Sequence, residues 1–139
     1  AKWHKKLGKE AVNLLKITNV SGRQYAFPDV HRRENGSISH MTNIKNYPVQ
    51  GFATGDVVPV VLMELEERLK PLQSCLVNTV HDSAVIDIHP KEKDYVIAII
   101  HSMNEDLTRI IAEAYDVEMN VPLLLEAKIG PNWLDTVDV

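Results

Sequence analysis

Two polar residues that can do chemistry, His81 and Asp82, stand side by side between two short apolar runs. The runs, at 75–80 (CLVNTV) and 84–88 (AVIDI), are rich in β-branched residues and too short for helices. Joined by a tight connection, they predict an antiparallel hairpin with His81 and Asp82 at its tip. Because a carboxylate on a rigid hairpin tip can bind a metal ion, Asp82 is a candidate metal ligand. Asp is also common in turns for conformational reasons alone, so a purely structural role stays open.

A second polar segment starts at Asn46, reads NYPVQG and predicts the beginning of a long helix. Asn46 suits the N-cap, and Pro48 suits the first turn, where its missing N–H loses no hydrogen bond. The helical pattern continues to Leu69, but Pro59 deletes one backbone hydrogen bond and clashes with the preceding turn. We therefore expect a kink or a restart of the helix there, with Asp56 as the cap of the restarted segment.

The elements that must position these residues follow from hydrophobic spacing and turn residues. The spacing predicts helices at 3–17 and 91–115, strands at 17–20, 23–27 and 121–125, and a polar loop at 30–42. Strands and helices in this order, with a hairpin at the centre, predict an α+β fold with an antiparallel sheet.

Length and composition are typical of one intracellular domain. The chain has 139 residues, 45% of them hydrophobic and 24% charged, which is enough apolar material for a packed core. Cys75 is the only cysteine, so no internal disulfide forms, and its apolar strand predicts a buried, reduced thiol. No run approaches the roughly 18 apolar residues of a membrane span, and no secretory signal is recognisable. We expect a cytoplasmic protein and, because residue 1 is Ala rather than Met, a piece of a longer chain.

Charge is unevenly distributed along the sequence. Residues 1–50 carry nine Lys or Arg against three Asp or Glu, whereas residues 51–139 carry six against sixteen. This distribution is expected if the basic residues 1–50 contact phosphates and the acidic residues 51–139 face solvent. For Lys2, Lys5, Lys6 and Lys9 alone, solvation of a terminal helix is the more common explanation, since charge runs are usually solvated faces.

Four blocks in order resemble the C-terminal palm region of family A (polymerase I-like) DNA polymerases, phage members most closely. Residues 22–29 (GRQYAFPD) resemble the family's G-R-R-x-x-x-P-[DE], and 46–51 (NYPVQG) resemble N-x-x-x-Q-G. Residues 80–82 (VHD) are similar to the V-H-D-E of motif C, and 121–133 contain a V-P-L followed by G-x-N-W. The resemblance extends over roughly residues 17–134 and implies an antiparallel palm sheet in which the central His-Asp hairpin packs against long helices. It further implies one palm-subdomain fragment over 1–139, with a fingers/palm junction at 1–45 and the palm core at 46–139.

The resemblance also implies functional roles. Asp82 would be one of two carboxylates that bind catalytic Mg²⁺, and His81 would act near the primer 3′ end. Asn46 and Gln50 would contact the minor groove of the primer–template, and Arg23 would contact DNA. The reaction would be two-metal nucleotidyl transfer from a deoxynucleoside triphosphate to the primer 3′-hydroxyl, which is template-directed DNA synthesis.

Three positions depart from the family pattern. Ser83 stands where the family has Glu, and a hydroxyl is a poor Mg²⁺ ligand beside a carboxylate. Thr42 stands where the family has Arg, which removes one charged primer contact. Residues 52–56 do not align cleanly with the family's small-residue run, and we expect a one-residue insertion there.

Two family segments are not found in these 139 residues: a D-Y-S-x-I-E-like strand and an R-x-x-x-K-x-x-x-Y-G-like fingers helix. We expect both to precede residue 1. The chain would then be a palm piece that cannot polymerise by itself and that works with missing fingers and thumb segments, primer–template DNA and dNTP.

Other interpretations remain open. The palm frame could serve as a non-enzymatic interaction or dimerisation module, since a truncated palm exposes apolar faces and could form a homo-oligomer. Asp56 or Asp87 could in principle pair with Asp82. The six histidines show no H-x-x-x-H spacing, which argues against a zinc site.

Overall fold

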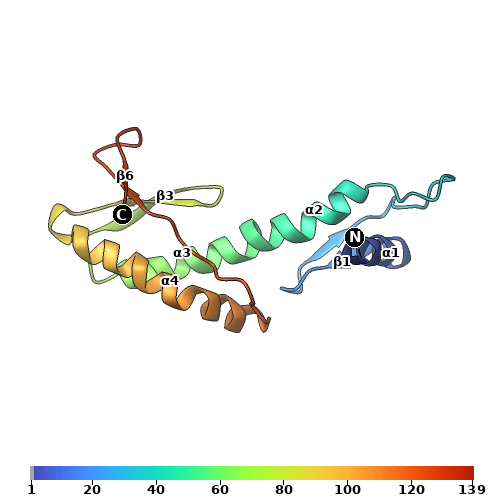
Figure 1. The fold of residues 1–139 in the computed structure, drawn as a ribbon, viewed down its shortest axis with the longest axis horizontal. Helices are drawn as coiled ribbons and strands as arrows, with labels where there is room; N and C mark the ends of the chain where they lie inside the picture. The colour runs from blue at the N-terminus through green and yellow to red at the C-terminus, as the bar shows by residue number, and fades with distance from the viewer. Residues whose placement is uncertain (1) are drawn as a thin grey trace. The chain divides into compact units, whose positions relative to one another are not determined.

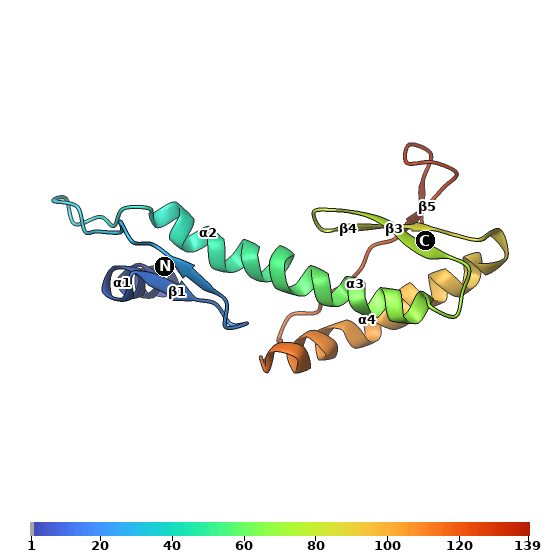
Figure 2. The ribbon, with the colours of Figure 1, turned by 180° about the vertical axis from the view of Figure 1, so that it is seen from behind.

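The structure, a computed structural model, describes residues 2–139 and is drawn in Figure 1 and, from behind, in Figure 2. It divides into two compact units, Ala1–Val57 (the N-terminal unit) and Val58–Val139 (the C-terminal unit). Helices and short antiparallel strands alternate along the chain, which confirms the α+β prediction. Within residues 2–139, no helix combines the length and hydropathy of a membrane span.

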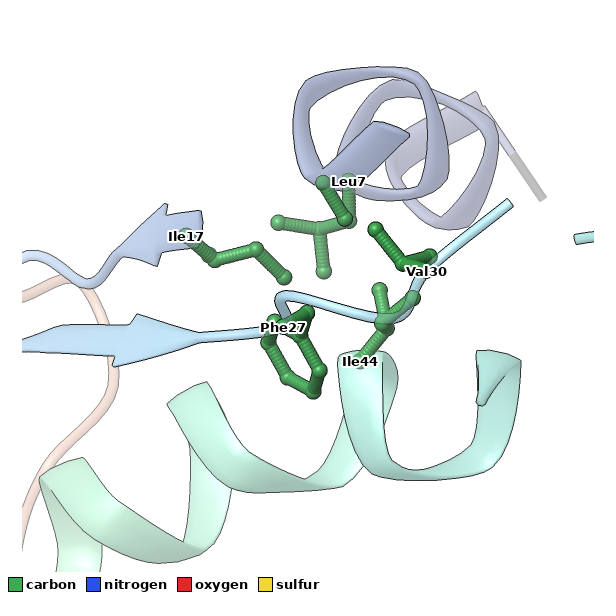
Figure 3. Packing of buried hydrophobic residues seen from close by; sticks show 6 residues of the cluster. Leu7, Ile17, Phe27, Val30 and Ile44 are labelled. Atoms are coloured by element: carbon green, nitrogen blue, oxygen red, sulfur yellow. The ribbon is translucent and has the colours of Figure 1, made fainter. Parts of the chain in front are cut away.

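The N-terminal unit is built from two helices, a two-stranded sheet and a helical turn. Its elements are α1 (Lys2–Leu14), β1 (Lys16–Thr18), β2 (Gln24–Ala26), α2 (Met41–Phe52) and η1 (Ala53–Val57). Strands β1 and β2 are antiparallel, with Ile17 opposite Tyr25. The core consists of apolar residues from both helices, strand β1 and the segment after β2: Leu7, Ala11, Ile17, Phe27, Val30 and Ile44. Figure 3 labels Leu7, Ile17, Phe27, Val30 and Ile44 within this cluster.

Helix α2 begins earlier than predicted. It starts at Met41, after His40 in a left-handed conformation with φ of 56°, so Asn46 is not an N-cap and Pro48 lies inside the helix. The capping prediction is wrong because tertiary packing outweighs it. Ile44 is buried in the core and Met41 packs against that core, which extends the helix towards the N-terminus.

The α-helical hydrogen-bond pattern is interrupted just before Pro59, as predicted. Residues Ala53–Val57 form a π-helical turn, η1, and α3 (Val58–Leu69) follows. In a regular α-helix the Pro59 ring would clash with the carbonyl of Gly55. A π turn places one extra residue in the helix, so the interruption coincides with the one-residue insertion expected at residues 52–56.

The C-terminal unit places a hairpin on a pair of helices. It contains β3 (Cys75–Val80), β4 (Ser83–Asp87), η2 (Pro90–Glu92), α4 (Lys93–Tyr115), β5 (Lys128–Ile129) and β6 (Val137–Asp138). Helices α3 and α4 lie side by side in both views (Figure 1, Figure 2). Their buried contacts are Leu65, Leu69, Val96 and Met103, and Leu76 and Ile86 of the hairpin pack against this cluster.

The strands do not join into one palm sheet. Over residues 2–139 they form three separate two-stranded sheets, β1-β2, β3-β4 and β5-β6. Cys75, expected to be buried, is exposed.

The strand predicted at 121–125 is absent, and side chains of α4 hydrogen-bond this extended segment instead. The backbone N–H of Leu123 donates to Thr108 Oγ1 at 3.0 Å, and that of Leu125 donates to Asn104 Oδ1 at 2.6 Å. Asn104 Nδ2 donates in turn to the Leu125 carbonyl at 3.0 Å. The alternating apolar pattern of this segment thus does not reveal that its hydrogen-bond partner is a helix.

Candidate functional site

His81 and Asp82 are the two residues that connect β3 to β4. The strands are antiparallel, with Val80 opposite Ser83, and the pair between them is exposed. Ser83 Oγ donates to the Val80 carbonyl at 2.8 Å and so closes the turn. Ser83, at the family's Glu position, therefore has a local structural role. The Asp82 carboxylate is exposed, as a ligand-binding role requires.

The hairpin turn holds His81 in an unfavourable backbone conformation. Its φ is +55°, in the left-handed region where glycine is preferred. The two turn types that two-residue hairpin connections favour both have a positive φ at the first central position, because this matches the twist of the strands. A histidine at this position therefore carries strain of about 1 kcal/mol or more, and strain of this kind is concentrated at functional sites.

A hydrogen-bond network fixes the other end of the hairpin. One Glu92 oxygen accepts from the Ser74 backbone N–H at 2.8 Å and from Ser74 Oγ at 2.7 Å. The Gln73 backbone N–H also donates to the Glu92 carboxylate at 3.0 Å. Ser74 Oγ accepts from the His89 N–H at 3.0 Å, so the residues that enter β3 and leave β4 are tied together. Donation from the Gln73 N–H and then the Ser74 hydroxyl lowers the pKa of Glu92.

Asn46 and Gln50 lie one helical turn apart on α2, and both are exposed. Residues four apart share a helix face, and Asn43, three residues before Asn46, lies on that face too and is exposed. We call Asn43, Asn46 and Gln50 the amide face. Asn43 was not identified from the sequence. Its spacing of three residues from Asn46 and seven from Gln50 indicates the same helix face.

The next residue, Gly51, allows close packing of α2 on β2. A Cβ at Gly51 would lie 1.7 Å from the Tyr25 hydroxyl oxygen, so no larger residue fits without displacement. The Tyr25 ring also contacts the Tyr47 ring, with centroids 5.9 Å apart. The backbone of the helix segment that carries Gln50 is thereby held against β2.

Asp56 is not a helix cap, contrary to prediction. It is buried in η1, where Oδ1 accepts from Arg23 Nε at 2.9 Å and Nη2 at 2.6 Å. Its Oδ2 accepts from Ser21 Oγ at 2.6 Å and Asn19 Nδ2 at 3.1 Å. Burial by itself raises the pKa of Asp56, but the hydrogen bonds from Arg23, Ser21 and Asn19 outweigh it and lower the pKa. Arg23 also donates to the Gly55 carbonyl at 3.1 Å, and its DNA contact stays a prediction.

The candidate residues fall into two separate sets. The amide face and Arg23 belong to the N-terminal unit, and His81 and Asp82 belong to the C-terminal unit. Asp87 pairs with Cys75 at the opposite end of the hairpin from Asp82, which makes it an unsuitable second ligand.

Asp82 belongs to no cluster of three or more metal-binding side chains in the described part of the chain. Across residues 2–139, the structure contains no group of three or more His, Cys, Asp or Glu side chains that could hold a metal ion. A two-metal centre needs more than one carboxylate. Asp82 alone is therefore not a complete two-metal centre.

Comparison with known proteins identifies the family. The model of DNA polymerase family A matches residues 1–135. DNA polymerase I of Deinococcus radiodurans is 29% identical over 66% of this chain and 8% of its own length, and the thermostable DNA polymerase I of Thermus filiformis is 28% identical over 86% and 13%. The DNA polymerase of Bacillus phage SP01 is 25% identical over 99% of this chain and 15% of its own length.

The chain thus spans between 8% and 15% of the length of these relatives. No solved structure gave a significant match. Because the family model covers nearly the whole sequence, the chain belongs to DNA polymerase family A.

Proposed function

We propose that this chain provides the C-terminal palm part of a template-directed DNA polymerase. The observation that carries the proposal is the exposed His81–Asp82 pair at a two-residue hairpin turn, in a chain that belongs to family A. The reaction would be attack of a primer 3′-hydroxyl on the α-phosphate of a dNTP. His81 at the strained turn would lie near the primer terminus.

The amide face would contact the minor groove of the primer–template. Every base pair presents acceptors there, at purine N3 or pyrimidine O2. The side chains of Asn46 and Gln50 can donate to these acceptors without a charge to desolvate. Because the acceptors are nearly the same for all base pairs, such contacts sense pair geometry and not sequence.

Asp82 would supply one ligand to catalytic Mg²⁺, and at least one further carboxylate, on the D-Y-S-x-I-E-like segment of the family, would complete the site. When bound, two Mg²⁺ ions would stabilise the attacking and leaving oxygens. The part that this chain can play alone is to position the primer–template and to hold one carboxylate at its terminus.

A binding assay on the 139-residue chain tests this proposal. We expect affinity for a labelled primer–template that falls steeply with salt, as for any protein that displaces counterions from phosphates. Gln50→Ala should weaken binding, and Gln73→Ala, which removes an exposed glutamine amide outside α2, should not. Equal affinities for the two variants would contradict the amide-face assignment.

A primer-extension assay tests the metal argument separately. With Mg²⁺ and dNTPs the isolated chain should extend no primer, because the D-Y-S-x-I-E-like segment, which would carry the second metal-binding carboxylate, is not found in these 139 residues. Robust Mg²⁺-dependent extension would overturn the view that the chain supplies only part of the active site.

A second candidate, a non-enzymatic interaction or dimerisation module, is favoured by exposed apolar side chains of the C-terminal unit. Trp133 is 69% exposed and Leu134 is 89% exposed, and both lie between β5 and β6. Light scattering distinguishes the two candidates. A stable dimer without measurable DNA affinity would favour the interaction module, whereas DNA binding that depends on Gln50 would favour the polymerase.

A further inference from the structure

Helix α1 presents a continuous row of lysines to solvent. Lys2, Lys5, Lys6 and Lys9 are all exposed and are spaced three, four and seven residues apart; we call them the lysine stripe. Residues at these spacings occupy one helix face. The buried residues of α1 are Leu7, Gly8 and Ala11, which lie on the opposite face. The stripe is therefore directed away from the core of the N-terminal unit.

The stripe is unfavourable for the helix that carries it. No acidic residue lies in the first turn of α1, although the partial positive charge of a helix N-terminus favours acids and disfavours lysines. Lys2 and Lys6, and likewise Lys5 and Lys9, are like charges four residues apart, which repel. None of the four forms an ion pair with a described residue. Helix α4, by contrast, has Asp94 in its first turn.

The surroundings strengthen the positive potential. Burial, and next the positive charge of Lys45 on α2, lower the pKa of His4, so Lys45 adds a cation close to α1. In the C-terminal unit most cations are paired with acids, as Arg68 is with Glu64 and Asp106. Trp3 is 46% exposed and stacks at a tilt on His4, with ring centroids 5.3 Å apart, at the border of the stripe.

We propose that the lysine stripe is a contact surface for the phosphate backbone of nucleic acid, separate from the amide face and the hairpin tip. From Lys2 to Lys9 the stripe is about 10 Å long, given the rise of an α-helix. This matches the axial length of about three phosphates of one strand. Release of counterions from those phosphates offsets the cost of holding like charges together. The choice of nucleic acid as the polyanion rests on the proposed function.

The test compares two variants of the full 139-residue chain that lose the same charge. One replaces Lys2, Lys5, Lys6 and Lys9 by Gln, and its control replaces Lys70, Lys91, Lys93 and Lys128 by Gln. A labelled DNA duplex is titrated at several salt concentrations. Each phosphate contact contributes about −0.9 to the slope of log Kobs against log salt concentration. Compared with the unmodified chain, the magnitude of this slope should therefore fall by about 3 in the stripe variant and by less than about 1 in the control. A Lys→Arg version of the stripe variant, which keeps the charge, should retain the slope.

A second readout uses the aromatic residue beside the stripe. In a Trp133→Phe background, Trp3 is the only tryptophan of the sequence. Addition of DNA should change the Trp3 fluorescence when the stripe lysines are replaced by Arg, but not in the stripe variant, in which they are replaced by Gln. Equal slopes for the stripe variant and its control would overturn the inference, as would absence of DNA affinity in the unmodified chain.

Failure of this inference can be told from failure of the proposed function. If Gln50→Ala weakens binding while the stripe variant binds like the unmodified chain, the stripe assignment is wrong and the polymerase proposal stands. If the stripe variant loses slope while Gln50→Ala and Asp82→Asn bind normally, the stripe assignment stands and the site assignment is wrong.

Discussion

The Arg23 guanidinium donates two hydrogen bonds to Oδ1 of Asp56, from Nε at 2.9 Å and from Nη2 at 2.6 Å. The pair joins the residue directly before β2 to the π-helical turn η1 that follows α2. The side chain of Asp56 is only 6% exposed, whereas that of Arg23 is 49% exposed. The Asp56 carboxylate is thus desolvated, and its hydrogen bonds with Arg23 compensate for this cost. Substitution of Asp56 should therefore affect stability more than substitution of Arg23.

Asp56→Asn should destabilise the protein by about 2 kcal/mol, because it removes a charge-assisted acceptor for Arg23 and leaves donors without a strong partner. Urea unfolding followed by circular dichroism measures this. Glu34→Gln, which removes an exposed carboxylate from the same unit, should change the free energy of unfolding by less than about 0.5 kcal/mol. An Asp56→Asn protein as stable as the unmodified chain would show that the ion pair contributes little.

The same pair should make stability depend on acid pH. The pKa of Asp56 is lower in the folded protein than its ordinary value of 3.8, so the unfolded chain binds the proton more tightly. Its contribution is complete above the unfolded pKa and is lost as pH falls through the folded pKa. The stability difference between the unmodified chain and Asp56→Asn should therefore be full at about pH 6 and shrink below about pH 4. A difference that grows on acidification would contradict this sign.

Gly51→Ala should destabilise the N-terminal unit, since its new Cβ would lie 1.7 Å from the Tyr25 hydroxyl oxygen and 2.7 Å from Tyr25 Cζ. Relief of such an overlap requires backbone or ring displacement, at a cost of about 1–3 kcal/mol. Gly55→Ala is the matched control, because the nearest atom to its Cβ is at an ordinary 3.6 Å. In thermal unfolding, the midpoint temperature of Gly51→Ala should be lower than that of the unmodified chain. The midpoint of Gly55→Ala should be equal to it or higher.

His81→Gly should separate stability from DNA binding. Glycine adopts the positive φ of position 81 without strain, so the hairpin should keep its stability or gain up to about 1 kcal/mol. The imidazole is lost, so primer–template affinity should fall. At the neighbouring position, Asp82→Gly relieves no positive φ and should lower stability by about 0.5–1 kcal/mol. If His81→Gly leaves primer–template affinity unchanged, the role of His81 at the primer end is wrong.

Glu92→Gln should loosen the base of the hairpin. The substitution weakens the acceptor used by Gln73 and Ser74, while the strand pairing itself is untouched. Amide hydrogen exchange of β3 and β4 should accelerate, and exchange in β1 and β2 should not. Glu126→Gln, which changes an exposed glutamate of the same unit, is the control. Uniform acceleration in all strands would indicate global destabilisation instead.

The features that sequence predicted correctly are those set by local pattern. The β-branched runs around His81 and Asp82 give the paired strands, the 3.6-residue stripe gives α4, and Pro59 gives the helix interruption. Each depends on residues within a few positions of one another.

The features that it predicted wrongly depend on partners far along the chain. Asn46 has the chemistry of a cap, but packing of Ile44 on the core decides where α2 begins. Asp56 was assigned to its own helix, whereas its partner Arg23 lies 33 residues earlier. Residues 121–125 have the alternation of a strand, but they pair with no strand, and Asn104 and Thr108 hydrogen-bond them instead. Spacing along the sequence carries no information about such partners.

The most direct test of the central claim is an NMR titration of the ¹⁵N-labelled chain with an unlabelled primer–template. We predict that the side-chain amides of Asn46 and Gln50, the His81 ring nitrogens and the Asp82 backbone amide shift together with DNA concentration. The α4 amide of Glu113, an exposed residue outside the four proposed sites, serves as the internal control. If DNA binds and shifts other resonances while these four sites stay unchanged, the assignment of a DNA-facing palm to this chain is contradicted.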